Sequence, residues 1–146
     1  MMAGKIVAMI QQLGPCVPLL QVFDLTSSLQ FYCDVLGFHI VQRTDNEWWA
    51  MLKLGDATLM LNTAYEDGQR PPSPDRARVW GHTDVSLYFE YPDLDGLYSH
   101  LRVHGCEVTP PGHTSYGLRQ MNVRDPDGYE ICFTAPIANS EPIQEQ

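Results

Sequence analysis

The chain has 146 residues, of which 44% are apolar and 18% charged, a composition that excludes an intrinsically disordered protein and fits one globular domain. Its apolar runs are far shorter than the ~20 residues of a membrane-spanning helix, so we expect no membrane partner. The net charge of −9 disfavours nucleic acid, whose phosphates it would repel, and favours cationic small molecules. The cysteines form no C-x-x-C pair and the N-terminal residues do not resemble a cleavable export signal, which together predict a cytoplasmic protein with reduced thiols.

The first half of the chain has the pattern of one β-α-β-β-β module. After an N-terminal extension over residues 1–14, the segment VPLLQVFDLTSSLQFYCDVLGFHIV predicts a strand, a short helix and a second strand. Asp24 is a good helix N-cap, and Gly37 stands where the end of the helix requires left-handed backbone. The runs WWAMLKLG and ATLMLNT predict two further strands, so the module spans about residues 15–65.

Residues 66–81, EDGQRPPSPDRARVWG, are rich in proline and show no periodicity. We predict a linker without regular structure, of a length that is uncommon in compact domains and often functional. Arg70, Arg76 and Arg78 make the linker locally basic, which suits either a solvated connector or a segment that closes over a site.

The second half of the chain repeats the first. The segment VSLYFEYPDLDGLYSHLRVHGCEV has the same order of strand and helix, with Asp93 at the position of Asp24 and Gly105 at the end of the helix. The runs LRQMNVR and YEICFTA predict two more strands. Residues 82–136 therefore form a second module, residues 137–146 form a flexible tail, and the fold class is α+β.

Two motifs carry a family resemblance. With D-L-x-x-S-L-x-F-Y-x-x-V-L-G-F in the first module and D-P-D-G-Y-x-I-x-F near the end, the sequence resembles the vicinal oxygen chelate superfamily, which includes glyoxalase I, extradiol dioxygenases and bleomycin-resistance proteins. The resemblance covers residues 15–136 and implies a single domain of two modules whose mixed sheets curl around a central cavity, often completed by dimerisation. In metal-dependent members, strand side chains in the cavity hold a divalent ion that binds two oxygens of the substrate.

The resemblance also locates four metal-ligand positions, which fall on Val17, Met60, Ser86 and Cys132. Ions of this kind need the lone pairs of His, Gln or Glu, and none of these residue types is present at the four positions. Cys132 alone could hold a soft ion, but a lone cysteine in a strand usually behaves as a small buried hydrophobe. We therefore predict no bound metal and no cofactor.

Alternation along the predicted strands selects the side chains that share the cavity face. They are mainly aromatic and apolar with a few polar groups, a composition that suits a small-molecule pocket but also an ordinary core. The candidate ligand-binding residues are Gln21, Trp48 and Trp49, of which one should point inward, Met60, Ser86, Tyr88, Glu90, Glu130 and Cys132. The DPDG sequence before Glu130 is explained by turn chemistry alone.

The histidines do not restore a metal site in the cavity. His82 is expected at the start of the second module's first strand, and His39 and His113 have no partner in the pattern. His100 and His104 are spaced i, i+4 on the predicted helix, a spacing that can bind a metal ion on a helix face, although the apolar pattern of this helix directs both side chains to solvent.

These features predict a metal-independent small-molecule-binding protein similar to the bleomycin-resistance branch. It would act as a homodimer and enclose an aromatic or cationic compound. The alternative is an enzyme of the same superfamily, a lyase, isomerase or dioxygenase, that uses a divalent metal or Glu130 as general base in an apolar cavity that raises its proton affinity. Glu130 is equally suited to a solvated position at the start of its strand.

Overall fold

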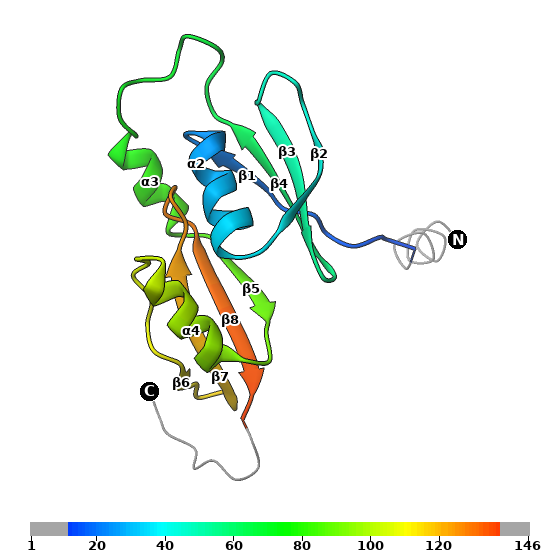
Figure 1. Cartoon of the computed structure of the whole chain (residues 1–146), viewed down its shortest axis with the longest axis vertical. Coiled ribbons are helices and arrows are strands. Elements are labelled where there is room, and N and C mark those ends of the chain that lie inside the picture. Colours follow the sequence, from blue (N-terminus) through cyan, green and yellow to red (C-terminus); the bar gives the residue numbers. More distant parts are fainter. Residues whose placement is uncertain (1–11, 138–146) are drawn as a thin grey trace, which may run out of the picture.

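The structure, a computed structural model, describes residues 12–137 (Figure 1). It contains two four-stranded mixed sheets, one from each half of the chain: sheet A has the strand order β1-β4-β3-β2 and sheet B has the order β5-β8-β7-β6. In both sheets the first strand pairs in parallel with the last, and the other pairs are antiparallel. The α+β fold with two related modules is thus confirmed.

The elements of the two modules follow the same order. Sheet A contains β1 (Leu19–Val22), β2 (His39–Arg43), β3 (Trp49–Leu54) and β4 (Ala57–Thr63), and α2 (Leu25–Leu29) continues into the π-helical segment η1 (Gln30–Val35) between β1 and β2. Sheet B contains β5 (Ser86–Glu90), β6 (Gly112–His113), β7 (Leu118–Arg124) and β8 (Glu130–Pro136), with α4 (Leu94–Val103) between β5 and β6. Gly37 ends the first helical region with φ +93°, a conformation that costs glycine little because it has no Cβ.

Each sheet has one face covered by a helix and one open face. On β1, Leu20 and Val22 are buried on the face that α2 covers, whereas Leu19 points the other way and is 44% exposed. On α4, Leu94, Leu97 and Leu101 are the buried residues. The alternation in β1 and the helical spacing of Leu97 and Leu101 therefore predicted these buried positions correctly.

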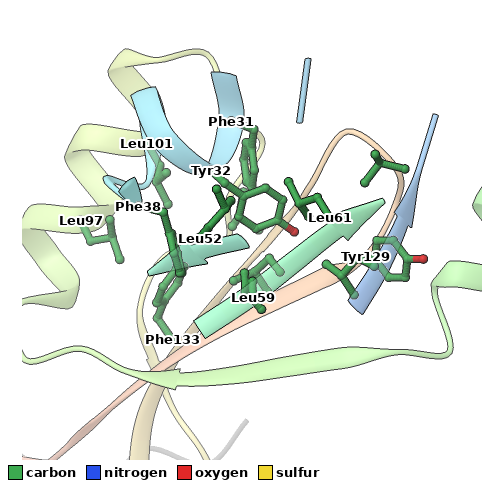
Figure 2. Close-up of a cluster of buried hydrophobic side chains, with 14 of the residues drawn as sticks. Phe31, Tyr32, Phe38, Leu52, Leu59, Leu61, Leu97, Leu101, Tyr129 and Phe133 are labelled. Atoms are coloured by element: carbon green, nitrogen blue, oxygen red, sulfur yellow. The ribbon is translucent and has the colours of Figure 1, made fainter. Parts of the chain in front are cut away.

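The two modules pack together through their helix-covered faces. Figure 2 shows Phe31, Tyr32 and Phe38 of the first module in one cluster with Leu101 and Phe133 of the second. Phe38 meets Phe89 of β5 edge to face, with 6.1 Å between the ring centroids. Within residues 12–137, this shared core leaves the other face of each sheet without a covering helix.

The segment between the modules contains a helix, α3 (Arg76–His82), so the prediction of a linker without regular structure over residues 66–81 was wrong for its last six residues, while residues 66–75 form no helix or strand. The prolines end at Pro74, and Asp75 then caps the helix by accepting a hydrogen bond from the Ala77 amide at 3.0 Å. Contact with the second module holds the helix in place, because Val79 lies so close to Gly128 that a Cβ there would approach it to 2.9 Å.

The sequence had indicated that His82 lies at the start of β5. In the structure it lies at the end of α3. Its ring stacks on Tyr129 with 4.1 Å between the centroids, and its Nδ1 lies 2.7 Å from the Asp127 carbonyl oxygen. A structural role in holding α3 against the second module explains this histidine.

Most of the predicted N-terminal extension and C-terminal tail lies outside the described residues. Within residues 12–137, no helix has both the length and the apolar character needed to cross a membrane.

Candidate functional site

The open face of sheet A is apolar around two amide groups. Its side chains come from three adjacent strands and lie opposite one another in the register, so they form one continuous surface. They are Leu19 and Gln21 on β1, Trp49 and Met51 on β3, and Met60 and Asn62 on β4. The Asn62 amide donates a hydrogen bond to Gln21 Oε1 at 3.4 Å. Thioether and indole groups give this face an adaptable apolar surface with a polar centre.

The two tryptophans have different surroundings. Trp49 lies opposite Asn62 on the open face of sheet A, whereas Trp48 precedes β3 and donates its indole N–H to Asp67 Oδ1 at 3.1 Å. Trp48 lines a separate polar hollow of about 390 Å³, together with Asp24 and Arg70 among other residues. Of the two candidates, only Trp49 belongs to the open face.

The open face of sheet B is polar and acidic. Ser86, Tyr88 and Glu90 project from β5, and the register places Glu130 opposite Ser86 and Cys132 opposite Tyr88 (Figure 1 shows β5 beside β8). Glu130 Oε1 accepts hydrogen bonds from the Ser86 hydroxyl at 2.9 Å and from the Cys132 thiol at 3.1 Å. The other oxygen, Oε2, lies 3.6 Å from the Arg124 guanidinium. Glu130 is therefore a positioned carboxylate and not a freely solvated one.

Cys132 is fully buried below this surface. Burial, and next the hydrogen bond that it donates to Glu130, raises the pKa of its thiol to about 12. Since the thiolate is the form that binds soft ions, burial in this position adds to the cost of deprotonating Cys132 and weakens it as a metal ligand.

The donors at the four inherited ligand positions do not fit a divalent ion. Val17 has no donor atom, Met60 offers a thioether among apolar neighbours, and Ser86 and Cys132 both donate to the same carboxylate. In the part of the chain that the structure describes, no group of three or more His, Cys, Asp or Glu side chains is arranged to hold a metal ion.

Sequence reasoning missed several residues of the open faces, above all on β7. Asn122 lies opposite Cys132 and Gln120 lies opposite Thr134, and the Gln120 amide donates to Asn122 Oδ1 at 3.1 Å. Tyr116 donates a hydrogen bond to Gln120 from the loop before β7. The alternation of polar and apolar residues in LRQMNVR was the signal that could have identified this part of the surface.

One chain does not gather the predicted residues around a single cavity. Leu19 on sheet A is 44% exposed and Tyr88 on sheet B is 58% exposed, while Ser86 and Glu90 are also exposed. The reason is that the modules pack through their helix-covered faces, so the two open faces remain accessible to solvent. The predicted ligand-binding residues are divided between these two faces, and Trp48 lies in the separate polar hollow.

The DPDG sequence has a further role beside its turn. Asp125 Oδ1 accepts the amide hydrogens of Asp127 and Tyr129, both at 2.9 Å, as turn chemistry predicts. Its other oxygen accepts the Tyr32 hydroxyl hydrogen at 2.7 Å across the module boundary. Burial raises the pKa of Asp125 to about 6, although the hydrogen bond from Tyr32 acts in the opposite direction.

Asp127 makes the second part of this contact. Its Oδ1 accepts the Phe23 amide hydrogen at 2.7 Å, and its Oδ2 accepts the Ser28 hydroxyl hydrogen at 3.3 Å. The motif therefore joins the start of the first module's helix to the second module. We call the contacts of Asp125 and Asp127 with the first module the DPDG contact.

The family model of the glyoxalase/bleomycin resistance protein/dioxygenase superfamily matches residues 12–133. The chain belongs to this superfamily. Among curated members, a bleomycin resistance protein of Geobacillus stearothermophilus is 30% identical over 128 residues, which cover 83% of this chain and 96% of that protein. This membership confirms the resemblance that the two sequence motifs carried.

Solved structures of superfamily members share the fold. A bleomycin resistance determinant encoded on the transposon Tn5 matches with a TM-score of 0.65 and 23% identity, over 86% of this chain and 100% of that one. A bleomycin-binding protein of Streptomyces verticillus, solved with copper(II)-bleomycin, matches with a TM-score of 0.63 and 24% identity, over 86% of this chain and 98% of that one. At these identities the likeness concerns the arrangement of the two modules and not the residues of the site.

Proposed function

We propose that this protein is a metal-independent binder of an aromatic or cationic small molecule. The observation that carries the proposal is the contrast between the two open faces. Sheet A offers Trp49, Met51 and Met60 as an apolar wall, and sheet B offers Tyr88 and carboxylates as a polar one. A ligand with an aromatic body and a positive charge would match both.

Within one chain the two walls do not face one another. A second copy of the chain is required to place a sheet A wall opposite a sheet B wall. On the open face of sheet A, Leu19 lies opposite Met60 and is 44% exposed, and a continuous apolar surface of this kind is suited to an interaction. In a two-fold symmetric homodimer, sheet A of one subunit would oppose sheet B of the other, and symmetry would generate two equivalent clefts. A cytoplasmic homodimer with two ligand sites is the form that we propose.

Metal independence is supported by the chemistry of the four inherited positions. Their side chains are a valine, a thioether, a hydroxyl and a thiol whose pKa is raised to about 12. Binding would then depend on contact area and on the positioned Glu130 carboxylate, which accepts two hydrogen bonds from its own sheet. Affinity alone is sufficient for such a function, because no bond of the ligand has to be broken.

The curated relatives provide the first probe, since the Geobacillus stearothermophilus protein is a bleomycin resistance protein. We would titrate chelator-treated, full-length protein with metal-free bleomycin and with copper(II)-bleomycin by calorimetry, and measure its mass in solution by light scattering. We expect two ligands per dimer and an affinity that is unchanged by the chelator. Binding that needs an added divalent ion would contradict metal independence, and full binding by a monomer would contradict the shared cleft.

Glu130 favours one second candidate, a metal-free proton-transfer enzyme. Its Oε1 is held by Ser86 and Cys132, so the carboxylate has a defined orientation, and its Oε2 lies 3.6 Å from the Arg124 guanidinium. The protein would be incubated in deuterated water with carbon acids of the kind that glyoxalases act on. Exchange of the carbon-bound hydrogen for deuterium would be followed by NMR. Exchange that is lost in Glu130→Gln supports the enzyme, and equal exchange in both proteins excludes this role of Glu130.

A further inference from the structure

We propose that His100 of α4 and His104, the residue that caps this helix, form a surface binding site for a transition-metal ion that prefers imidazole ligands, such as Cu²⁺, Ni²⁺ or Zn²⁺. The two residues are spaced i, i+4, which places them on the same side of a helix, and their ring centroids are 4.3 Å apart. Because α4 covers the buried face of sheet B, this site lies away from Glu130 and the open faces. The proposal is independent of the small-molecule function.

The hydrogen bonds of the two rings determine which nitrogens can bind an ion. His100 Nε2 lies 2.6 Å from the Val35 carbonyl oxygen, and His104 Nδ1 lies 2.9 Å from the His100 carbonyl oxygen. A carbonyl oxygen only accepts, so both of these nitrogens carry a hydrogen. In the neutral form of the rings, the lone pairs are therefore on His100 Nδ1 and His104 Nε2.

This arrangement is the one that histidine ligands of metal ions usually have. A ligating imidazole generally donates its other N–H to a carbonyl or a carboxylate, which sets the tautomer and the ring orientation and increases the basicity of the ligating nitrogen. Both His100 and His104 already have such a partner in the absence of an ion. The structure thus provides two neighbouring imidazoles whose hydrogen bonds set the tautomer and the ring orientation before an ion binds.

The position on the helix favours a cation. His104 is the residue directly after α4 ends, where the last carbonyl groups carry partial negative charge. Both side chains are exposed, so an ion can reach them without a rearrangement of the core. The nearby Arg102 donates to the Tyr98 hydroxyl at 3.0 Å and lies 5.7 Å from the centre of that ring, so it has its own partner. Water would complete the coordination, because the described residues supply no third ligand.

An ion at this site would act on the contact between the modules. His100 joins α4 of the second module to Val35 at the end of η1 in the first. An ion on His100 Nδ1 withdraws electron density from the ring, which makes the Nε2–H a stronger donor to the Val35 carbonyl. Metal binding should therefore raise the midpoint of thermal unfolding.

The test uses the full chain without a histidine tag, first dialysed against a chelator and then titrated with Cu²⁺, Ni²⁺ and Zn²⁺ by calorimetry. We expect one ion per chain, and the electron paramagnetic resonance spectrum of bound Cu²⁺ should show coupling to imidazole nitrogen. His104→Ala keeps the His100 contact with Val35 and should lower the affinity at least about tenfold. His39→Ala, which removes an exposed histidine of β2, is the matched control and should leave the affinity unchanged.

Two further variants separate this site from the inherited cavity positions. Cys132→Ser and Glu130→Gln alter the open face of sheet B and should leave metal binding unchanged, whether or not the protein binds bleomycin. An affinity that is the same in His104→Ala as in the original protein, or no binding at millimolar concentrations of all three ions, would overturn the proposal.

Discussion

Carboxylate side chains are found both in the DPDG contact and on the open faces of the sheets, but their surroundings differ. In the DPDG contact, Asp125 and Asp127 are 5% and 3% exposed and their oxygens accept hydrogen bonds from the other module. On the open faces, Glu90 is exposed and Glu130 is half-buried. Burial makes the first pair determinants of stability, while accessibility leaves the second pair available to a ligand. Substitutions should therefore separate stability from binding.

The largest effect is expected from Asp127→Ala in the DPDG contact. The change leaves the Phe23 amide and the buried Ser28 hydroxyl without their acceptor, and a buried donor without a partner costs ~1–3 kcal/mol. We expect the free energy of unfolding to fall by about 4 kcal/mol, measured by urea denaturation. The control is Asp67→Ala, which removes an exposed carboxylate and should change stability little. Equal stability of the two variants would show that Asp127 does not hold the modules together.

Acidification should stabilise the fold through Asp125, because a neutral carboxyl group is less costly to bury than a carboxylate. Burial raises its pKa from 3.8 to about 6, so the folded protein binds a proton more tightly than the unfolded chain does. The resulting stabilisation, about 3 kcal/mol, is fully present below pH 3.8 and is lost as the pH rises through about 6. The measurement is the difference in unfolding free energy between the original protein and Asp125→Asn across this range, because the difference cancels the other carboxyl groups. A difference that does not change with pH would contradict the assignment.

The two tryptophans test the open face of sheet A. Trp49→Ala removes the aromatic wall of the proposed cleft and should weaken bleomycin binding by about 2 kcal/mol, or roughly thirtyfold. Trp48→Ala is the matched control, because its indole donates to Asp67 outside this face, and should keep the affinity. Calorimetric titration of both variants decides the question, and a loss of affinity in Trp48→Ala alone would place the ligand in the hollow beside Asp67.

The smallest effect is expected on the open face of sheet B. Glu130→Gln keeps the size of the side chain and an acceptor for the Ser86 hydroxyl but removes the negative charge. A partly exposed charge contributes modestly, so we expect a cationic ligand to bind about 1 kcal/mol more weakly, with a smaller dependence on salt concentration. Unfolding free energy should stay nearly constant. If the variant binds as tightly at low salt as the original protein, Glu130 does not contact the ligand charge.

Local patterns were sufficient to predict much of the fold. The two-residue alternation in LLQV identified Leu20 and Val22 as buried, and Gly37 marked the end of the first helical region. The same reasoning placed Glu130 and Cys132 on one face, where they are hydrogen bonded. It failed at α3, because this helix is stabilised by the contact between Val79 and Gly128, which no local pattern indicates.

The amino-acid sequence by itself determined the repeat of two modules, the alternation of each strand and the unsuitable donors at the inherited metal positions, because these depend on neighbouring residues or on residue type. Only the tertiary structure decided which sheet faces are closed, which tryptophan lies on an open face, and that the DPDG sequence joins the modules. Phe23 and Asp127, for example, are 104 positions apart and still form a hydrogen bond of 2.7 Å. Contacts of this range depend on how two modules pack, and packing is a property of the whole core.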